Sequence, residues 1–165
     1  MKVKLFSDIN EFRNFYTSLY KEIPKGWFCG FALDNSVYTL SLSEYKKCYS
    51  HENATILDLI RLVLHEFTHA VHSKRNDNLE CKWLREGVAT YLSGQYEDAN
   101  EIKCTYDELL NCCSYANYKA MFEYVLNTYG KEYILKLIDD EELLNKDSKR
   151  LFEEAVSFYK KEVFK

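Results

Sequence analysis

The sequence has few of the residues that break regular structure. It contains one proline, Pro24, and five glycines among 165 residues, which favours a mainly helical chain with few sharp turns. It has no apolar run near the roughly 20 residues needed to cross a bilayer. The first residues, MKVKLFSDINEF, have no apolar stretch long enough for a signal peptide. We therefore expect a cytoplasmic protein that does not insert into a membrane.

The sequence also lacks a strong excess of one charge. It has 22 basic and 26 acidic residues, a formal net charge of −4 and a pI near 5.6. The basic residues are scattered, so neither a nucleic acid nor an anionic membrane is an expected partner. With 47% hydrophobic and 29% charged residues and no visible linker, residues 1–165 are predicted to form a single domain.

The six cysteines do not have the CxxC spacing of zinc ribbons or redox motifs. Two of them, Cys112 and Cys113, are adjacent. In a chain without a signal peptide, we expect free thiols that pack as small hydrophobic residues.

Periodicity predicts strands in the first third of the chain and helices after it. The predicted strands are 2–6, 27–33 and 37–42, the last two joined by a turn at 34–36. Alternation in the last strand predicts one apolar and one more polar face. The predicted helices are 9–21, capped by Ser7 or Asp8; 53–74, with a Thr55–Asp58 pair; 83–92, ended by Gly94; a short helix capped by Thr105 and Glu108; 115–129, capped by Ser114; 131–138; and 148–164. This order indicates an α+β protein, with a small N-terminal antiparallel sheet and a mostly helical second half.

The clearest chemical signal is an HExxH motif in the longest predicted helix, His65-Glu66-Phe67-Thr68-His69. Residues four apart are neighbours on a helix surface, so both imidazoles can reach one metal ion. Glu66 lies beside them, where its carboxylate can contact a water molecule that the metal activates. Apolar residues surround the motif, so both histidines should be substantially buried, and buried imidazoles need partners.

A catalytic zinc site needs a third protein ligand, and the candidates are His72 and Glu86. His72 follows His69 by three residues, but a straight helix puts it about 10 Å along the axis from His65. Glu86 begins a second helix that can fold back against the first, and Gly87 beside it permits close helix–helix approach. Without a metal, Glu86 is an ordinary carboxylate in the first turn of a helix.

The segments HEFTH and WLREGVATYL together resemble the gluzincin zinc metallopeptidases of peptidase clan MA. The resemblance implies a thermolysin-like zincin catalytic core. It also implies that Zn²⁺ is held by His65, His69 and Glu86, and that Glu66 is the general base. The short chain is most similar to the minimal gluzincins, or minigluzincins, which keep only a catalytic core.

Two further segments extend this resemblance. Residues 114–130, SYANYKAMFEYVLNTYG, resemble the aminopeptidase-type segment that carries a catalytic tyrosine, which implies that Tyr115 stabilises the oxyanion; Tyr118 is the competitor. The segment GFALDN resembles the edge strand that pairs with substrate, which implies substrate binding at Gly30, Phe31 and Ala32. That strand normally includes a Met-Glu pair, whose absence here favours an endopeptidase over an aminopeptidase.

The expected function is zinc-dependent hydrolysis of a peptide or protein substrate. One alternative is a zinc-site protein of the same fold that is non-catalytic or self-inhibited and serves in regulation or binding. Another is a metal-free helical interaction domain in which HExxH is coincidental. The retained Glu66 and Tyr115 argue against a purely structural zinc site, because such a site needs neither.

Overall fold

The computed structural model describes residues 1–162. The chain folds into two compact units, one from Met1 to Val71 and one from His72 onward. The first unit contains a three-stranded sheet and the second contains helices, so the α+β class is confirmed. The expectation of a single domain over 1–165 stays a prediction.

The sheet of the first unit is mixed, where an antiparallel sheet was predicted. Its strands are β1 (Lys2–Phe6), β2 (Gly30–Leu33) and β3 (Ser36–Leu40), in the order β1-β3-β2. The antiparallel β2–β3 pair follows from its short connection, but β1 pairs with β3 in parallel. The direction of β1 depends on pairing between residues far apart in the chain, which the alternation within one strand does not report.

The predicted turn between β2 and β3 is confirmed. Its two central residues, Asp34 and Asn35, have φ angles of 46° and 63°. Two consecutive positive φ angles are typical of the tight hairpin turns that match the twist of paired strands, and Asp and Asn tolerate this conformation well. The turn thereby fixes the register of β2 against β3, with Leu33 opposite Ser36.

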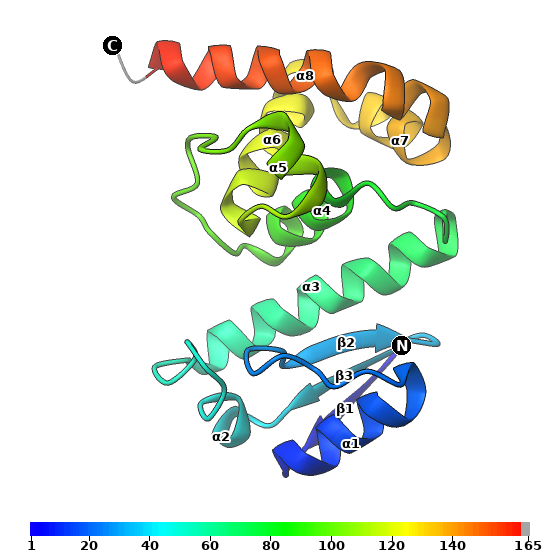
Figure 1. The fold of residues 1–165 in the computed structure, drawn as a ribbon, viewed down its shortest axis with the longest axis vertical. Coiled ribbons are helices and arrows are strands. Elements are labelled where there is room, and N and C mark those ends of the chain that lie inside the picture. Colours follow the sequence, from blue (N-terminus) through cyan, green and yellow to red (C-terminus); the bar gives the residue numbers. More distant parts are fainter. Residues whose placement is uncertain (163–165) are drawn as a thin grey trace. The chain divides into compact units, whose positions relative to one another are not determined.

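Helices cover both faces of this sheet (Figure 1): α1 (Ile9–Tyr20) lies on one side and α3 (Ile56–Arg75) on the other. On the α1 side, Phe12 and Phe15 contact Phe31 and Tyr38, with ring centroids 5.8 and 5.1 Å apart in the Phe12–Phe31 and Phe15–Tyr38 pairs. Thr39 of the opposite face is also fully buried. The face predicted to be the more polar one is therefore also buried, at Thr39.

Two capped helices of the first unit follow the predictions closely. Asp8 caps α1 by accepting hydrogen bonds from the backbone N–H groups of Asn10 and Glu11. At the start of α3, the Asp58 carboxylate accepts from the backbone and hydroxyl of Thr55, so the predicted capping pair is confirmed. A short helix, α2 (Leu42–Tyr45), occupies the predicted end of the third strand.

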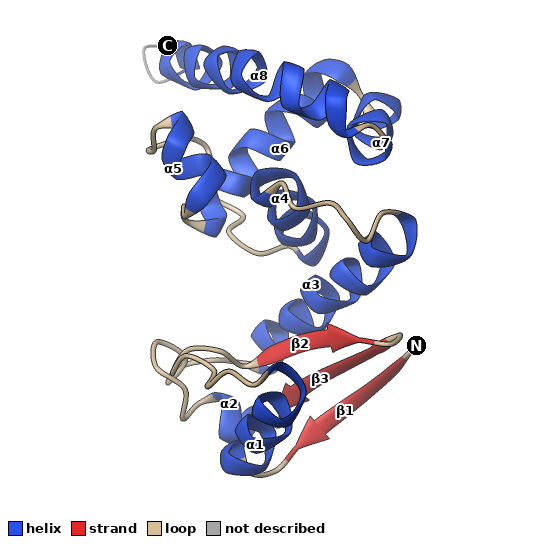
Figure 2. Ribbon diagram, turned by 45° about the vertical axis from the view of Figure 1, so that its right-hand side comes forward, coloured by secondary structure: helices blue, strands red, loops and turns tan. Residues whose placement is uncertain are grey.

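The second unit is helical (Figure 2). It contains α4 (Lys82–Ser93), α5 (Tyr106–Asn111), α6 (Tyr115–Tyr129), α7 (Lys131–Asp139) and α8 (Glu141–Glu162). The capping box of Thr105 and Glu108 and the Ser114 cap of α6 are confirmed. Helix α8 begins at Glu141, before the predicted residue 148. At this start, the side chain of Asp140 accepts a hydrogen bond from the backbone N–H of Leu143. The predicted last residues of that helix, 163–164, lie outside the described residues.

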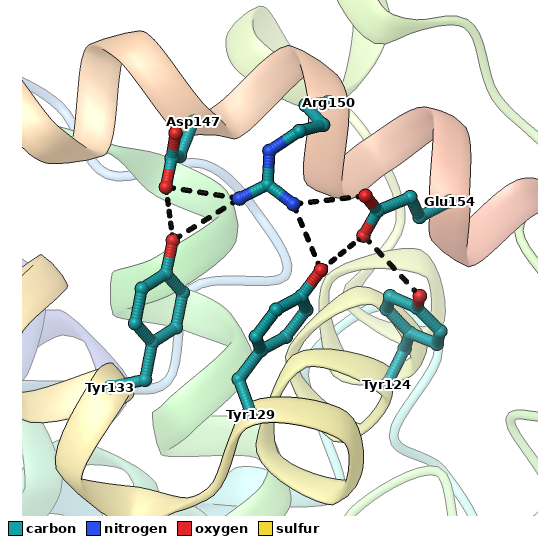
Figure 3. A network of polar contacts seen from close by, with 6 residues as sticks. All are labelled: Tyr124, Tyr129, Tyr133, Asp147, Arg150 and Glu154. Carbon is teal, nitrogen blue, oxygen red and sulfur yellow. Dashed lines mark hydrogen bonds and ion pairs between the residues drawn. The ribbon is translucent and has the colours of Figure 1, made fainter.

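A polar network attaches α8 to α6 and α7 (Figure 3). The guanidinium of Arg150 donates to Asp147 at 3.0 Å and to Glu154 at 2.9 Å. Tyrosine hydroxyls from the other two helices donate to these carboxylates: Tyr133 to Asp147, and Tyr129 to Glu154 at 2.5 Å. Each carboxylate therefore joins α8 to a neighbouring helix.

None of the helices within residues 1–162 has the length and apolar character required to cross a membrane.

Candidate metal centre

The two histidines of HExxH converge on the surface of α3. Their Nε2 atoms lie 3.0 Å apart, and the two rings are nearly perpendicular, at 86°. Two imidazoles that each bind zinc at about 2.0–2.1 Å in tetrahedral geometry place their nitrogen atoms about 3.3 Å apart. The observed separation is close to that value, so the pair fits two ligands of one zinc ion. A hydrogen bond between the two rings, with one nitrogen donating, fits the same separation.

The burial of the pair is only partly as expected. His65 is 5% exposed and His69 is half-buried. Not all of the apolar residues around the motif are buried: Leu64 is 42% and Phe67 38% exposed. The expected burial of both histidines is therefore met by His65 and only in part by His69.

Glu66 lies against the first residue of β2. A Cβ atom built on Gly30 would lie 3.5 Å from Cγ of Glu66 and 3.5 Å from the side chain of Leu62. The strand therefore passes directly over the helix at the position of HExxH. Within the first unit, the structure brings together the predicted general base and the predicted substrate strand.

The outer edge of β2 offers backbone groups for a further strand. Within residues 1–162, β2 is an edge strand with β3 as its one partner. The backbone N–H of Leu40 donates to the carbonyl of Cys29, which makes Cys29–Leu40 a hydrogen-bonded pair of the antiparallel ladder. By the alternation of such ladders, the N–H and C=O groups of Gly30 and Ala32 point to the outer edge.

Phe31 has a different place from its two neighbours. By the same alternation its backbone groups bond to β3, opposite Tyr38. Its side chain is 6% exposed and stacks on Tyr38 at a centroid distance of 5.1 Å. Of the three predicted substrate-binding residues, Gly30 and Ala32 are thus at the free edge, and Phe31 belongs to the core.

In the second unit, Glu86 lies on α4 where this helix meets α6. A Cβ atom on the adjacent Gly87 would lie 2.6 Å from the carbonyl oxygen of Tyr118 and 2.8 Å from Cβ of Phe122. Only glycine fits this contact. The close approach that the structure shows at Gly87 is to α6, whereas the sequence prediction concerned the approach of this helix to the HExxH helix, which stays a prediction. The carboxylate of Glu86 is 3.5 Å from the guanidinium of Arg85.

Tyr115 and Tyr118 have different environments on α6. Tyr118 is 4% exposed, and its hydroxyl oxygen accepts the backbone N–H of Cys113 at 2.9 Å. Burial raises its pKa, opposed by this hydrogen bond. Tyr115 is half-buried at the first residue of the helix. The Tyr118 hydroxyl is therefore engaged within the second unit, and the role of Tyr115 stays a prediction.

Tyr96 is a neighbour of Tyr115 that sequence reasoning missed. The two rings stack with centroids 6.3 Å apart at 20°. Tyr96 follows Gly94, the left-handed end of α4, and itself has a φ of 52°. No periodicity reports such a contact. The available signal was an aromatic residue just after a helix-ending glycine.

The other third-ligand candidate, His72, is buried at 7% exposure. The imidazoles of His65 and His69 and the carboxylate of Glu86 are all side chains of the types that bind zinc. Two of these belong to the first unit and Glu86 to the second.

Comparisons with protein-family models, with curated proteins and with solved structures found no match. The reading of the site therefore depends on this chain's own residues.

Proposed function

We propose that this protein is a zinc-dependent peptidase with a thermolysin-like catalytic core. The main support comes from the first unit, where two imidazole nitrogens lie 3.0 Å apart on one helix. In the same unit, Glu66 lies next to Gly30, the first residue of the edge strand β2. A metal-ligand pair, a base and a free strand edge are three of the parts from which a site for metal-assisted peptide hydrolysis can be built.

The proposed ligands are His65, His69 and Glu86. Two imidazoles and one carboxylate are the donor set of many catalytic zinc sites, and they leave the fourth position open for water or substrate. In this proposal α3 supplies the two imidazoles and α4 supplies the carboxylate. When bound, zinc would polarise the scissile carbonyl and lower the pKa of water to about 7.

The chain's own residues would then carry the protons. Glu66 accepts the proton of the attacking water and delivers it to the leaving amine. Tyr115 donates its hydroxyl proton in a hydrogen bond to the carbonyl oxygen as negative charge develops there. The ring of Tyr96, stacked on Tyr115, holds that hydroxyl in one direction.

The substrate in this proposal is a peptide or protein segment in extended form. It would add to the outer edge of β2 and bond to the backbone groups of Gly30 and Ala32. Main-chain pairing of this kind binds a segment through its backbone and does not require a free terminus. Together with the absence of the Met-Glu pair from the strand sequence, this favours internal cleavage.

The test compares wild type with Glu66→Gln on a peptide library, with metal content measured on both. The amide keeps the shape of the side chain but cannot accept a proton at neutral pH. We expect equal zinc in both proteins and at least a 10³-fold loss of cleavage in the variant. Glu132→Gln, an exposed change on α7, is the matched control and should cleave normally.

The outcomes distinguish the alternatives. Zinc without cleavage in wild type would favour a regulatory or self-inhibited zinc protein, and protein without zinc would favour a metal-free interaction domain. Cleavage that survives Glu66→Gln would remove Glu66 from its role.

The third ligand is tested by Glu86→Ala. We expect loss of stoichiometric zinc and a lower melting temperature, because a ligand that binds only the folded state stabilises it. Full zinc occupancy in this variant would place the third ligand elsewhere, and His72→Ala would be measured next.

A further inference from the structure

Two cysteines flank the short helix α5 in the second unit. Cys104 precedes the capping residue Thr105, and Cys113 follows Cys112, the residue at the end of the helix. Both are half-buried, while Cys112 is exposed. All six cysteines of the chain have free thiols in the structure.

One buried amide group draws these two segments together. The side chain of Asn117, 7% exposed, accepts the backbone N–H of Lys103 at 2.7 Å. The same amide donates from Nδ2 to the sulfur of Cys113 at 2.9 Å. Asn117 therefore holds the residue before Cys104 and the sulfur of Cys113 at once, which brings the Cys104 thiol into the neighbourhood of that sulfur.

The surroundings give the two sulfurs different roles. Cys113 lies just before the N-terminus of the 15-residue helix α6 and accepts an N–H hydrogen bond. Burial, together with the contact to Cys113, raises the pKa of the Cys104 thiol. Cys104 is thus the slower partner, which reacts second.

A second neighbouring pair, in the first unit, provides a comparison. The thiols of Cys29 and Cys48 also interact, but these residues are only 4% and 1% exposed. An external reagent must open the core of that unit to reach them. The thiols of each pair are neighbours, but of the two pairs only Cys104 and Cys113 are partly exposed to solvent.

We propose that Cys104 and Cys113 form a reversible redox site that closes to a disulfide by exchange with small external disulfides of the glutathione type. The inference is independent of the metal centre, because neither cysteine is a proposed ligand. It makes the entry to α6, two residues before Tyr115, sensitive to the thiol–disulfide balance of the surroundings.

The exchange has two balanced steps. The Cys113 thiolate attacks one sulfur of the external disulfide, forms a mixed disulfide and releases the first small thiolate, which takes up a proton. Cys104 then loses its proton and attacks the Cys113 sulfur, releasing the second small thiolate, which is also protonated. Two protein thiols lose two electrons and two protons, and the external disulfide gains them as two thiols.

The experiment equilibrates the full chain with mixtures of oxidised and reduced glutathione and then counts free thiols in denaturant after acid quenching. We expect the count to fall from six to four per chain and to return to six in excess reduced glutathione. Cleavage after Glu108 separates Cys104 from Cys113 in the digest, so a bridge will hold the two fragments together until reduction.

Three single variants assign the bridge. Cys104→Ser and Cys113→Ser should each abolish it, whereas Cys112→Ser, a change at the exposed neighbour, should leave it intact. Six free thiols under oxidising mixtures, a bridge that survives Cys113→Ser, or oxidation of Cys29 and Cys48 instead would each overturn the inference. Because wild type alone gives the thiol count and the linked fragments, a variant that fails to fold does not prevent a decision.

Discussion

The two units position their candidate site residues by different means. In the first unit, His65 and His69 lie on one helix, and their geometry follows from a spacing of four residues. In the second unit, Glu86 and Tyr115 lie on two helices, α4 and α6, and depend on how closely these helices approach at Gly87. A side-chain pair on one helix tolerates changes elsewhere. A pair across two helices depends on every contact that sets their separation.

The units also differ in how they bury their tyrosines and phenylalanines. In the first unit the rings contact one another between α1 and the sheet. In the second unit several tyrosine hydroxyls bond to carboxylates of α8 (Figure 3). The stability of helix contacts made by ionisable tyrosines and carboxylates depends on pH, whereas the stability of a core of apolar rings does not. The predictions below use these differences, beginning with the largest expected effect.

The first prediction concerns the tyrosine assigned to the second unit's part of the site. Tyr115→Phe should lower kcat and kcat/KM together by about 10²–10³-fold, because its hydroxyl would act mainly in the transition state. Zinc content and melting temperature should hardly change. Steady-state kinetics on a cleaved peptide, with metal analysis on the same sample, measures both.

Tyr118→Phe is the control, three residues further along α6. It loses the hydrogen bond from the backbone of Cys113, which should cost about 1 kcal/mol of stability while activity stays near normal. If Tyr118→Phe abolishes cleavage and Tyr115→Phe does not, the roles are reversed. If neither changes turnover, another group stabilises the oxyanion.

Local signals in the sequence predicted most of the fold. Capping residues such as Asp8, Thr55 and Ser114 and the helix-ending Gly94 mark the ends of helices, because the groups that satisfy a helix terminus are its near neighbours in sequence. The parallel pairing of β1 with β3 could not be predicted in this way. Nor could burial of the second sheet face, since it depends on where α3 packs.

In the candidate site, too, the features that depend on one segment were predictable, and those that depend on packing between distant residues were not. The convergence of His65 and His69 follows from the helix itself and was predictable. The stacking of Tyr96 on Tyr115 and the core position of Phe31 arise from packing between distant residues, and no spacing within one segment reports them. The assignment of Tyr115 rather than Tyr118 rests on a resemblance and stays a prediction.

The second prediction compares one glycine from each unit. Gly87→Ala places a methyl group 2.6 Å from the carbonyl oxygen of Tyr118. We expect a loss of about 2 kcal/mol or more, because overpacking outweighs the better helix propensity of alanine. Gly30→Ala meets only ordinary contacts at 3.5 Å and should change stability by less than about 0.5 kcal/mol.

Chemical denaturation followed by hydrogen exchange would locate each effect. Loss of protection in Gly87→Ala should be confined to α4 and α6, with α3 unaffected. Equal destabilisation by both substitutions would show that the difference in close approach does not matter. A stable Gly87→Ala protein with low cleavage would show instead that the two helices move apart without unfolding.

The smallest effect is expected in the polar network of α8. A hydrogen bond from Tyr133, with further help from Arg150, lowers the pKa of Asp147. A hydrogen bond from Tyr129 and the Arg150 guanidinium do the same for Glu154. A carboxylate with a lowered folded-state pKa stabilises the fold above its unfolded pKa, and this contribution is lost as pH falls through the folded value.

Arg150→Met should therefore cost about 0.5–1 kcal/mol near neutral pH, a small effect because the guanidinium is partly exposed and screened. The difference from wild type should shrink as pH falls below the ordinary carboxyl pKa values of 3.8 and 4.5. At alkaline pH the direction is the opposite, because the contribution of a tyrosine with a raised pKa is lost as pH rises. Burial and the hydrogen bond to Asp147 raise the pKa of Tyr133 to about 12, so its contribution is complete below pH 10 and is lost on the way to 12. Urea unfolding of both proteins from pH 3 to 11 measures these arms, and a difference that is independent of pH would show that Arg150 stabilises α8 by packing alone.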